Sequence, residues 1–259
     1  MLSIKILTTL SIVLSLAWIA EKIDTRVAGI LAGMPLGALL IFSFVGYELG
    51  PLFVSEGAIF AIPGIAGTLT FAGIYYFISL KNIPFNPLIS SFSGIIGYSI
   101  LTFGLSHIIF NLFTSLIFGL LTIAIFFKIL QRIPNIKILT PIKLTINQII
   151  LRGFGSSTIV IIITEASEYL GPKWSGLLVG FPITFLPFIL IIHMTYSREH
   201  AHTIIRNFPI GLGSLVSFLT VIPLIMPQFG VTFGIIFSFL ASLLYLTIFI
   251  FIPTLKKLK

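Results

Sequence analysis

The feature that most constrains this chain is a series of long uncharged stretches that recurs from one end to the other. Only 8% of its 259 residues are Asp, Glu, Lys or Arg, and the mean hydropathy is +1.17. An ordinary soluble domain is about 25% charged. A helix needs roughly 17 to 25 apolar residues to cross about 30 Å of hydrocarbon, and many stretches here are that long. The sequence therefore predicts an all-α, polytopic transmembrane helix bundle whose first partner is the lipid bilayer.

Charged residues and turn-forming residues divide the apolar sequence into about nine expected spans. The spans cover residues 3–20, 27–46, 58–80, 86–105, 107–127, 148–167, 174–194, 204–225 and 231–252. The separation at Ser106 and His107 is the least marked of these boundaries. From the sequence alone, the region 86–127 could therefore form either one span or two.

The basic residues predict how the chain is oriented. With nine spans, all of the 15 Lys and Arg residues except Lys5 and Lys173 fall on one side. Cationic loops remain in the cytoplasm, so we expect a plasma (inner) membrane protein with its N-terminus outside and its C-terminus inside. The net charge of +8 lies in short loops rather than in one patch with aromatic residues, and no nucleic-acid partner is expected.

Two octapeptides, AGILAGMP at 28–35 and SGLLVGFP at 175–182, are nearly the same and lie 147 residues apart. At this offset Gly29, Gly33 and Pro35 align with Gly176, Gly180 and Pro182, and Glu21 aligns with Glu168. Coincidence in a chain rich in Gly, Leu and Ile is the alternative. The aligned charges favour an internal duplication.

A duplication predicts three parts of the chain. Residues 1–105 would form a first transmembrane repeat of four spans, 106–147 a connector span with a basic cytoplasmic linker, and 148–259 a second repeat of four spans. Five spans separate equivalent positions, so the second repeat would enter the membrane from the opposite side. This inverted 4+1+4 arrangement is a recurrent plan of secondary transporters.

The glycines and prolines of the octapeptides are the expected substrate-binding residues: Gly29, Gly33, Pro35, Gly176, Gly180 and Pro182. Glycines four apart let a second backbone approach closely, and a proline frees a carbonyl one turn earlier. In lipid that carbonyl must find a partner or line a cavity. The alternative is helix packing with a tolerated kink and no binding role.

Four ionisable residues are candidates for proton or ion coupling: Glu165, Glu168, Glu21 and His193. Intramembrane charges are costly, which makes their positions informative. The alternatives are that Glu168 pairs with Lys173 and that His193 is an interfacial residue. His200 and His202 are interpreted as part of a solvated loop, and no metal site and no cofactor are expected.

The segment SGLLVGFPITFLPFILIIHMTYSREHAHTIIRN, with its G-x-x-x-G-x-P opening, second proline, His193 and S-R-E turn, resembles the GlpM family. The resemblance covers roughly residues 168–252 and implies a hydrophobic unit of four helices in an inner membrane. It implies no established biochemistry. The chain departs from the family in its length, and Gly46 stands where the first repeat would carry a counterpart of His193.

The sequence favours a small secondary transporter or permease for an unidentified small solute. A non-transporting accessory or scaffold protein and a narrow ion channel are the alternatives, and a homodimer is possible in each case. An enzyme is not expected, because the chain has neither H-E-x-x-H nor G-x-S-x-G and contains no cysteine.

Overall fold

The computed structural model describes residues 7–8, 11, 25–134 and 145–255. Most of the expected first span, Glu21, most of the basic linker and residues 256–259 lie outside the described residues.

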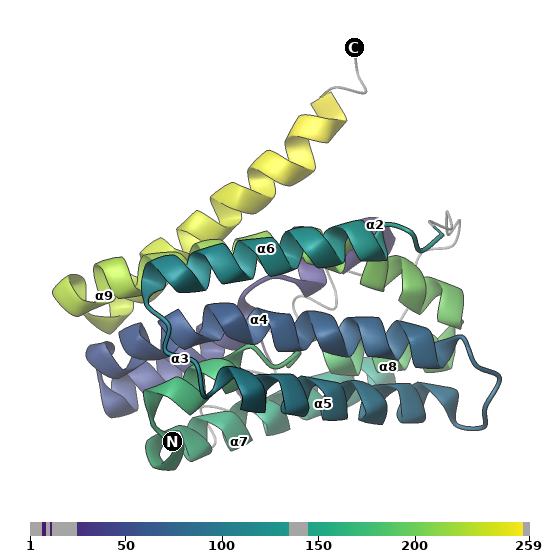
Figure 1. Ribbon diagram of the computed structural model, residues 1–259, viewed down its shortest axis with the longest axis horizontal. Helices are drawn as coiled ribbons and strands as arrows, with labels where there is room; N and C mark the ends of the chain where they lie inside the picture. The colour runs from purple at the N-terminus through teal and green to yellow at the C-terminus, as the bar shows by residue number, and fades with distance from the viewer. Residues whose placement is uncertain (1–6, 9–10, 12–24, 135–144, 256–259) are drawn as a thin grey trace.

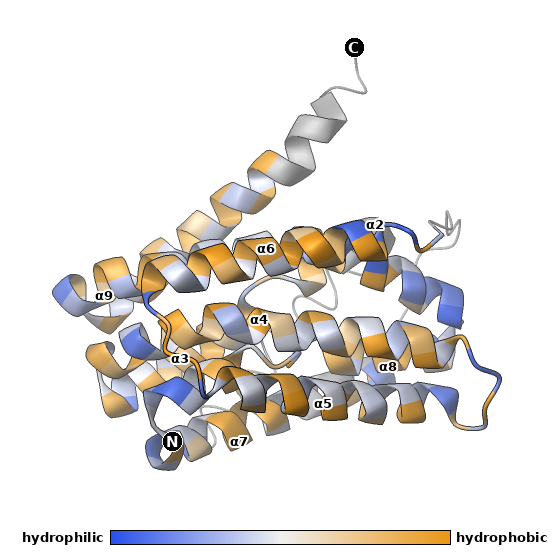
Figure 2. Ribbon diagram, viewed as in Figure 1, coloured by the Kyte–Doolittle hydropathy of each residue, from blue (hydrophilic) through white to orange (hydrophobic). Residues whose placement is uncertain are grey.

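The described part of the chain is built from helices, and no strand occurs in it. The helices are α2 (Thr25–Ala32), α3 (Leu36–Leu49), α4 (Pro51–Ser79), α5 (Asn86–Leu105), α6 (Leu112–Leu130), α7 (Ile146–Val179), α8 (Phe185–Thr195) and α9 (Arg198–Leu255) (Figure 1). Within the described residues, six helical stretches are long and apolar enough to cross a membrane. The predicted all-α, multi-pass character is therefore confirmed, and hydrophobic residues dominate along the helices (Figure 2).

Two of the long helices are divided by a glycine. Gly171 in α7 has φ 76° and Gly230 in α9 has φ 78°. Glycine adopts positive φ without a steric penalty, whereas other residues rarely do. Each of these helices therefore consists of two parts that meet at a kink, residues 146–170 and 172–179 in α7, and residues 198–229 and 231–255 in α9. The last part of α9 extends away from the other helices (Figure 1).

The region 86–127 contains two helices. α5 ends at Leu105 and α6 begins at Leu112, after a short connection. Asn111 caps α6, because its side chain accepts from the Thr114 backbone N–H at 2.9 Å while the Thr114 hydroxyl accepts from the Asn111 N–H. The cap satisfies amide groups that would otherwise be left unpaired at the start of an apolar helix.

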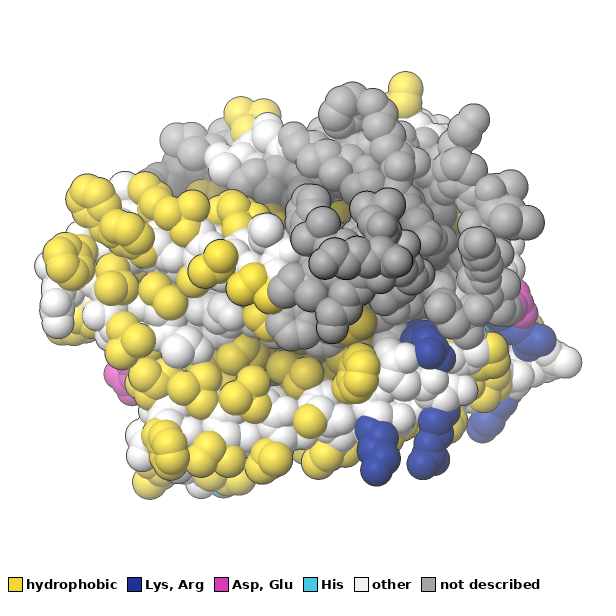
Figure 3. Space-filling model, turned by 90° about the horizontal axis from the view of Figure 1, so that it is seen from above, with side chains coloured by type: hydrophobic (Ala, Val, Ile, Leu, Met, Phe, Trp, Pro, Cys, Tyr) yellow, Lys and Arg dark blue, Asp and Glu magenta, His cyan; other side chains and the backbone are white. Residues whose placement is uncertain are grey.

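The helix α4 lies at the centre of the bundle, in contact with α5, α6, α7 and α9 (Figure 1). Several of its large side chains, including Phe71 and Tyr75, are fully buried. In contrast, α5 and α6 present rows of exposed Phe, Leu and Ile side chains. Hydrophobic side chains also cover much of the face in Figure 3. Such outward apolar faces suit a helix whose surroundings are lipid.

The two ends of the bundle carry different charges. At one end, here called the basic end, lie Lys81, Lys128, Arg132, Arg198 and Arg206, and Lys and Arg side chains gather towards one side in Figure 3. Arg206 donates to the backbone oxygens of Gln131 and Ile133, which fixes the end of α6 beside the start of α9. Lys173 lies at the opposite end, 5.5 Å from the centre of the Phe60 ring. Which end faces the cytoplasm stays a prediction.

Both octapeptides interrupt a helix. α2 ends at Ala32 and α3 begins at Leu36, while α7 ends at Val179 and α8 begins at Phe185. Backbone hydrogen bonds between residues three apart in sequence replace the helical pattern there. For example, the Gly33 N–H donates to the Ile30 oxygen at 3.0 Å. Pro35 and Pro182 have no backbone N–H to donate, which explains why neither helix continues unbroken.

Candidate functional site

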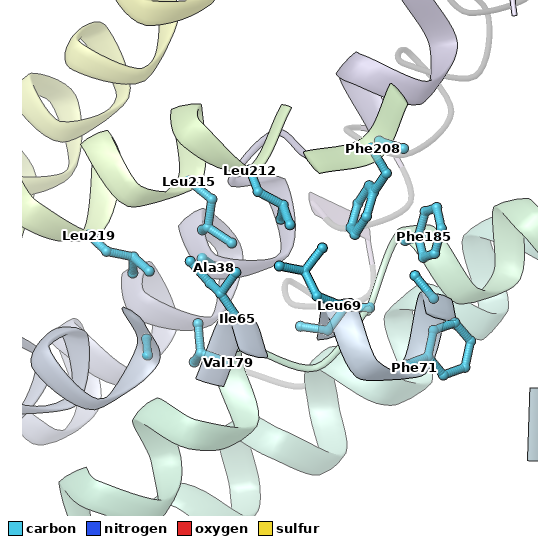
Figure 4. Packing of buried hydrophobic residues seen from close by; sticks show 14 of the residues in the cluster. Ala38, Ile65, Leu69, Phe71, Val179, Phe185, Phe208, Leu212, Leu215 and Leu219 are labelled. Atoms are coloured by element: carbon cyan, nitrogen blue, oxygen red, sulfur yellow. The ribbon is translucent and has the colours of Figure 1, made fainter. Parts of the chain in front are cut away.

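The two helix interruptions meet around a small cavity, here called the central cavity, of about 30 Å³. Residues 32–38 except Leu36 form one part of its wall, residues 179–185 except Gly180 form a second part, and Phe208, Leu212 and Leu215 of α9 complete it. Ala38, Leu212 and Leu215 project towards one another in Figure 4. A water molecule needs on the order of 10 to 15 Å³ of such space, so the cavity holds very little in this conformation.

Three of the six expected binding residues line the central cavity: Gly33, Pro35 and Pro182. Gly29, Gly176 and Gly180 are not in its wall. They lie where one helix crosses another, Gly29 against Ile204 of α9 and Gly176 against Gly57 of α4. The structure thus divides the residues of the two interruptions between cavity lining and helix packing, and their role in binding a substrate stays a prediction.

The closest helix crossings bring backbone against backbone. A Cβ atom on Gly33 would lie 2.5 Å from the carbonyl carbon of Gly211, and one on Gly180 would lie 2.6 Å from that of Gly64. Only glycine permits such an approach without displacing the partner helix. The two crossings correspond to each other, because each of their residues is 147 positions from its counterpart.

Side chains from α4, α5 and an earlier part of α7 satisfy the carbonyl groups around the second interruption. Thr68 of α4 donates to the Gly180 oxygen. Tyr98 of α5 donates to the Leu177 oxygen at 2.6 Å, and Ser156 of α7 donates to the Ile183 oxygen at 3.2 Å. An unpaired carbonyl in lipid costs several kcal/mol, so these bonds stabilise the non-helical backbone. Nothing in the sequence marked these three side chains as partners.

The wall of the central cavity is apolar. Ala32, Ala38, Val179 and Leu212 are typical of its side chains, and Thr184 adds a hydroxyl group. The residues that line it include no Asp, Glu, Lys, Arg or His. A permanently charged solute would have no opposite charge to meet there, and burying a charge without one is costly.

A group of aromatic rings separates the central cavity from the basic end. Phe185 and Phe208 stack with their centroids 3.9 Å apart, and both line the cavity (Figure 4). Phe71 of α4 contacts Phe185 edge to face at 6.2 Å. Tyr75, one turn further along α4, lies 6.0 Å from Phe71 and shares a 2.8 Å hydrogen bond with Nδ1 of His193. We call Phe71, Tyr75, Phe185, Phe208 and His193 the aromatic barrier.

On the far side of the aromatic barrier the surface is hollowed. This hollow, here called the basic-end hollow, measures about 790 Å³ and lies between the α4–α5 connection, the end of α8 and the start of α9. His193 and Ser79 form part of its wall. The candidate His193 is therefore half-buried between the hollow and the barrier, in contact with Tyr75.

The interpretation of His200 and His202 as loop residues was wrong. Both lie in the first turns of α9, and His202 is only 7% exposed. Its Nε2 lies 2.7 Å from the Ser79 hydroxyl, and its ring contacts Tyr76 edge to face at 4.8 Å. Because the helix begins at Arg198, His202 turns inward against α4, whereas the Arg198 and Glu199 side chains stay at the surface.

The carboxylate candidates lie elsewhere. Glu165 and Glu168 are exposed on α7, in the last turns before Gly171, and line neither the central cavity nor the basic-end hollow. Because α7 starts at the basic end, where Gln148 donates to Thr195 at 2.8 Å, these carboxylates lie near the opposite end. Glu21 is outside the described residues.

Comparisons of the chain with family models, with characterised proteins and with solved structures find no match. The functional argument therefore rests on the geometry of the two helix interruptions and of the aromatic barrier beside them.

Proposed function

We propose that this protein is a small secondary transporter that moves a small, uncharged solute by alternating access between two inverted repeats. In this proposal the chain crosses the membrane nine times in a 4+1+4 arrangement. The single observation that carries it is the central cavity, where both helix interruptions meet. Transporters with inverted repeats bind their solutes at such a place, between discontinuous helices near the midplane.

The helix boundaries support the duplication. Shifted by 147 residues, α2 becomes 172–179, which is the part of α7 after Gly171. The same shift turns α4 into 198–226, which begins where α9 begins, and α5 into 233–252, which lies within the part of α9 after Gly230. The shifted bounds of three helices thus agree with observed helical segments, and a similar amino-acid composition alone would not produce this agreement.

The direction of the equivalent helices supports an inverted rather than a parallel repeat. Ser79 in the last turn of α4 contacts His202 in the first turns of α9. These two helices are equivalent under the 147-residue shift, and the end of one lies beside the start of the other. They therefore pass each other in opposite directions, as an axis in the membrane plane would require.

The aromatic barrier supplies the element that would move. It closes the path from the basic end to the central cavity, and the cavity itself is too small for a solute, so the structure corresponds to an occluded state in this mechanism. Ile222, Ala38, Ala61 and Gly46 stand at the positions equivalent to Tyr75, Phe185, Phe208 and His193. Of the five barrier positions, only Phe71 has an aromatic equivalent, Phe218. The two halves of the path therefore differ chemically, because the stack of Phe185 on Phe208 and the hydrogen bond of Tyr75 with His193 have no equivalent in the other half.

Flux into proteoliposomes tests the proposal. A panel of labelled, uncharged small solutes should include one whose uptake saturates with concentration and exceeds that of protein-free vesicles. Ala38→Leu should abolish this uptake because it fills the central cavity. Ala124→Leu, an equal change on the exposed face of α6, should leave it unchanged.

The alternatives give different outcomes in the same assay. Flux that does not saturate would indicate a narrow channel. No flux of any solute by monodisperse protein would indicate an accessory or scaffold protein, a function that the backbone contacts of Gly33 with Gly211 also fit. Uptake of a charged solute with a measurable current would contradict the uncharged substrate class while leaving transport intact.

A further inference from the structure

The residues that line the basic-end hollow are of two chemical kinds. The polar ones, here called the polar wall, include Lys81, Asn82, Ser197, Arg198 and Glu199. The apolar ones, here called the apolar wall, include Ile83, Phe85, Leu88 and Met194. At about 790 Å³ the hollow is within the range of roughly 300 to 1,000 Å³ that is typical of small-molecule sites.

The polar wall carries a net positive charge and is partly preorganised. Nε of Arg198 lies 2.9 Å from the Glu199 carboxylate, and its Nη1 donates to the Asn82 side-chain oxygen at 3.4 Å. These contacts restrain the guanidinium group beside Asn82 and Glu199 in the lining of the hollow. Glu199 offsets one of the two cations in this wall, so Lys81 and Arg198 together leave one positive charge in excess.

The apolar wall continues onto the outer face of α5. Phe85 is 77% exposed, and the exposed side chains Leu88, Phe92 and Ile96 follow it along the helix. Among the described non-glycine residues, Phe85 alone has a positive φ, 52°. A bulky residue rarely adopts this conformation, and such strain is concentrated at functional sites. An occupant of the hollow can therefore place its polar part on Lys81 and Arg198 while its apolar part follows α5 into the hydrocarbon.

We propose that the basic-end hollow binds the phosphate headgroup of an anionic phospholipid, with an acyl chain along the exposed stripe of α5. The ammonium group of Lys81 and the guanidinium group of Arg198 are the phosphate donors. Basic pockets between transmembrane helices are recognised sites for anionic headgroups. This site does not depend on whether the chain transports a solute.

Lipid retention by the full-length protein tests the site. The protein is reconstituted into vesicles of equal phosphatidylglycerol and phosphatidylcholine, extracted in mild detergent, and its bound lipid is counted by native mass spectrometry. Wild-type protein should retain phosphatidylglycerol in preference to phosphatidylcholine. The double variant Lys81→Gln/Arg198→Gln should lose this preference by on the order of 30-fold, since each cation near an anionic lipid contributes about fivefold.

The matched control is Lys128→Gln/Arg132→Gln, which removes two exposed cations from the same end outside the hollow. It should retain phosphatidylglycerol like the wild type. Lys81→Gln alone, in an exposed connection, provides a second variant with an expected loss of about fivefold.

Three results would overturn the proposal. One is equal retention by wild type and the Lys81/Arg198 variants. Another is an equal loss in the Lys128/Arg132 control, which would show a general effect of surface charge. The third is complete displacement of phosphatidylglycerol by millimolar inorganic phosphate or glycerol 3-phosphate, which would assign the hollow to a soluble phosphate compound.

Discussion

The Tyr75 hydroxyl lies 2.8 Å from Nδ1 of His193, and this hydrogen bond ties the central helix α4 to the end of α8. It lies between the aromatic stack over the central cavity and the hollow at the basic end. In the proposed alternating-access cycle, α4 and α8 would separate at this point before solute passes between the cavity and the basic end.

Tyr75→Phe removes the hydrogen bond and keeps the ring. A net hydrogen bond contributes about 1 kcal/mol, so the open state should become about fivefold more populated. The measurement uses a single cysteine, Ala38→Cys, in the central cavity of this cysteine-free chain. Its reaction with a small thiol reagent should be about fivefold faster in the Tyr75→Phe background.

The control is Tyr47→Phe, which removes the 2.8 Å bond between Tyr47 and Thr232 at the opposite end. Thiol labelling at position 38 should stay at the wild-type rate in this variant. An unchanged rate in Tyr75→Phe itself would show that the hydrogen bond does not close the path.

Gly33→Ala should destabilise the protein by about 1 to 3 kcal/mol, the usual cost of overpacking. The new Cβ would lie 2.5 Å from the Gly211 carbonyl carbon, and the backbone there cannot yield as a side-chain end could. Unfolding in mixed detergent measures the difference. Gly104→Ala is the control, since its Cβ would meet nothing within 4 Å and alanine is the better helix former by roughly 0.5 to 1 kcal/mol. Equal stability of the two variants would rule out a tight Gly33 crossing.

Thr68→Val should cost about 0.6 to 1.7 kcal/mol, because it removes the donor to the Gly180 oxygen at the second interruption. The substitution keeps the shape of the side chain, so packing contributes little to the difference. Thr247→Val removes only a 2.8 Å bond to Leu243 in the same helix, on an exposed face, and should cost less. If the two variants unfolded alike, the interruption would not need Thr68.

Cysteine labelling from outside intact cells should distinguish the two ends. With nine spans and an inverted repeat, Tyr47→Cys and Tyr169→Cys should react with an impermeant maleimide, and Lys81→Cys should react only after the cells are broken. Tyr47 is 66% exposed and Lys81 lies in an exposed connection. A cysteine there that fails to react is therefore protected by the membrane and not by burial within the protein. Labelling of Lys81→Cys from outside would reverse the predicted orientation.

The helical class and the interruptions were predictable because both have local causes. Apolar stretches in lipid must satisfy their backbone groups internally and become helices, and Pro35 and Pro182 each remove a donor where a helix would continue. The kink at Gly230 was also predictable, because it falls in the gap between the expected spans 204–225 and 231–252.

The contacts of the candidate site were not predictable in the same way. Tyr75 and His193 are 118 residues apart, and Thr68 and Gly180 are 112 residues apart. No local pattern relates such residues, since their meeting depends on how the helices cross. His202 was misassigned for a related reason, because a polar local sequence resembles a loop until α4 supplies Ser79 as a buried partner.

The paired glycine crossings have a consequence for how the chain acquires its structure. α2 packs on α9, and the part of α7 after Gly171 packs on α4, so each short half-helix completes the opposite half of the protein. The contact of Gly33 with Gly211 can form only after Gly211 has been synthesised. Neither half of the chain can therefore complete its own packing before the other half is in place.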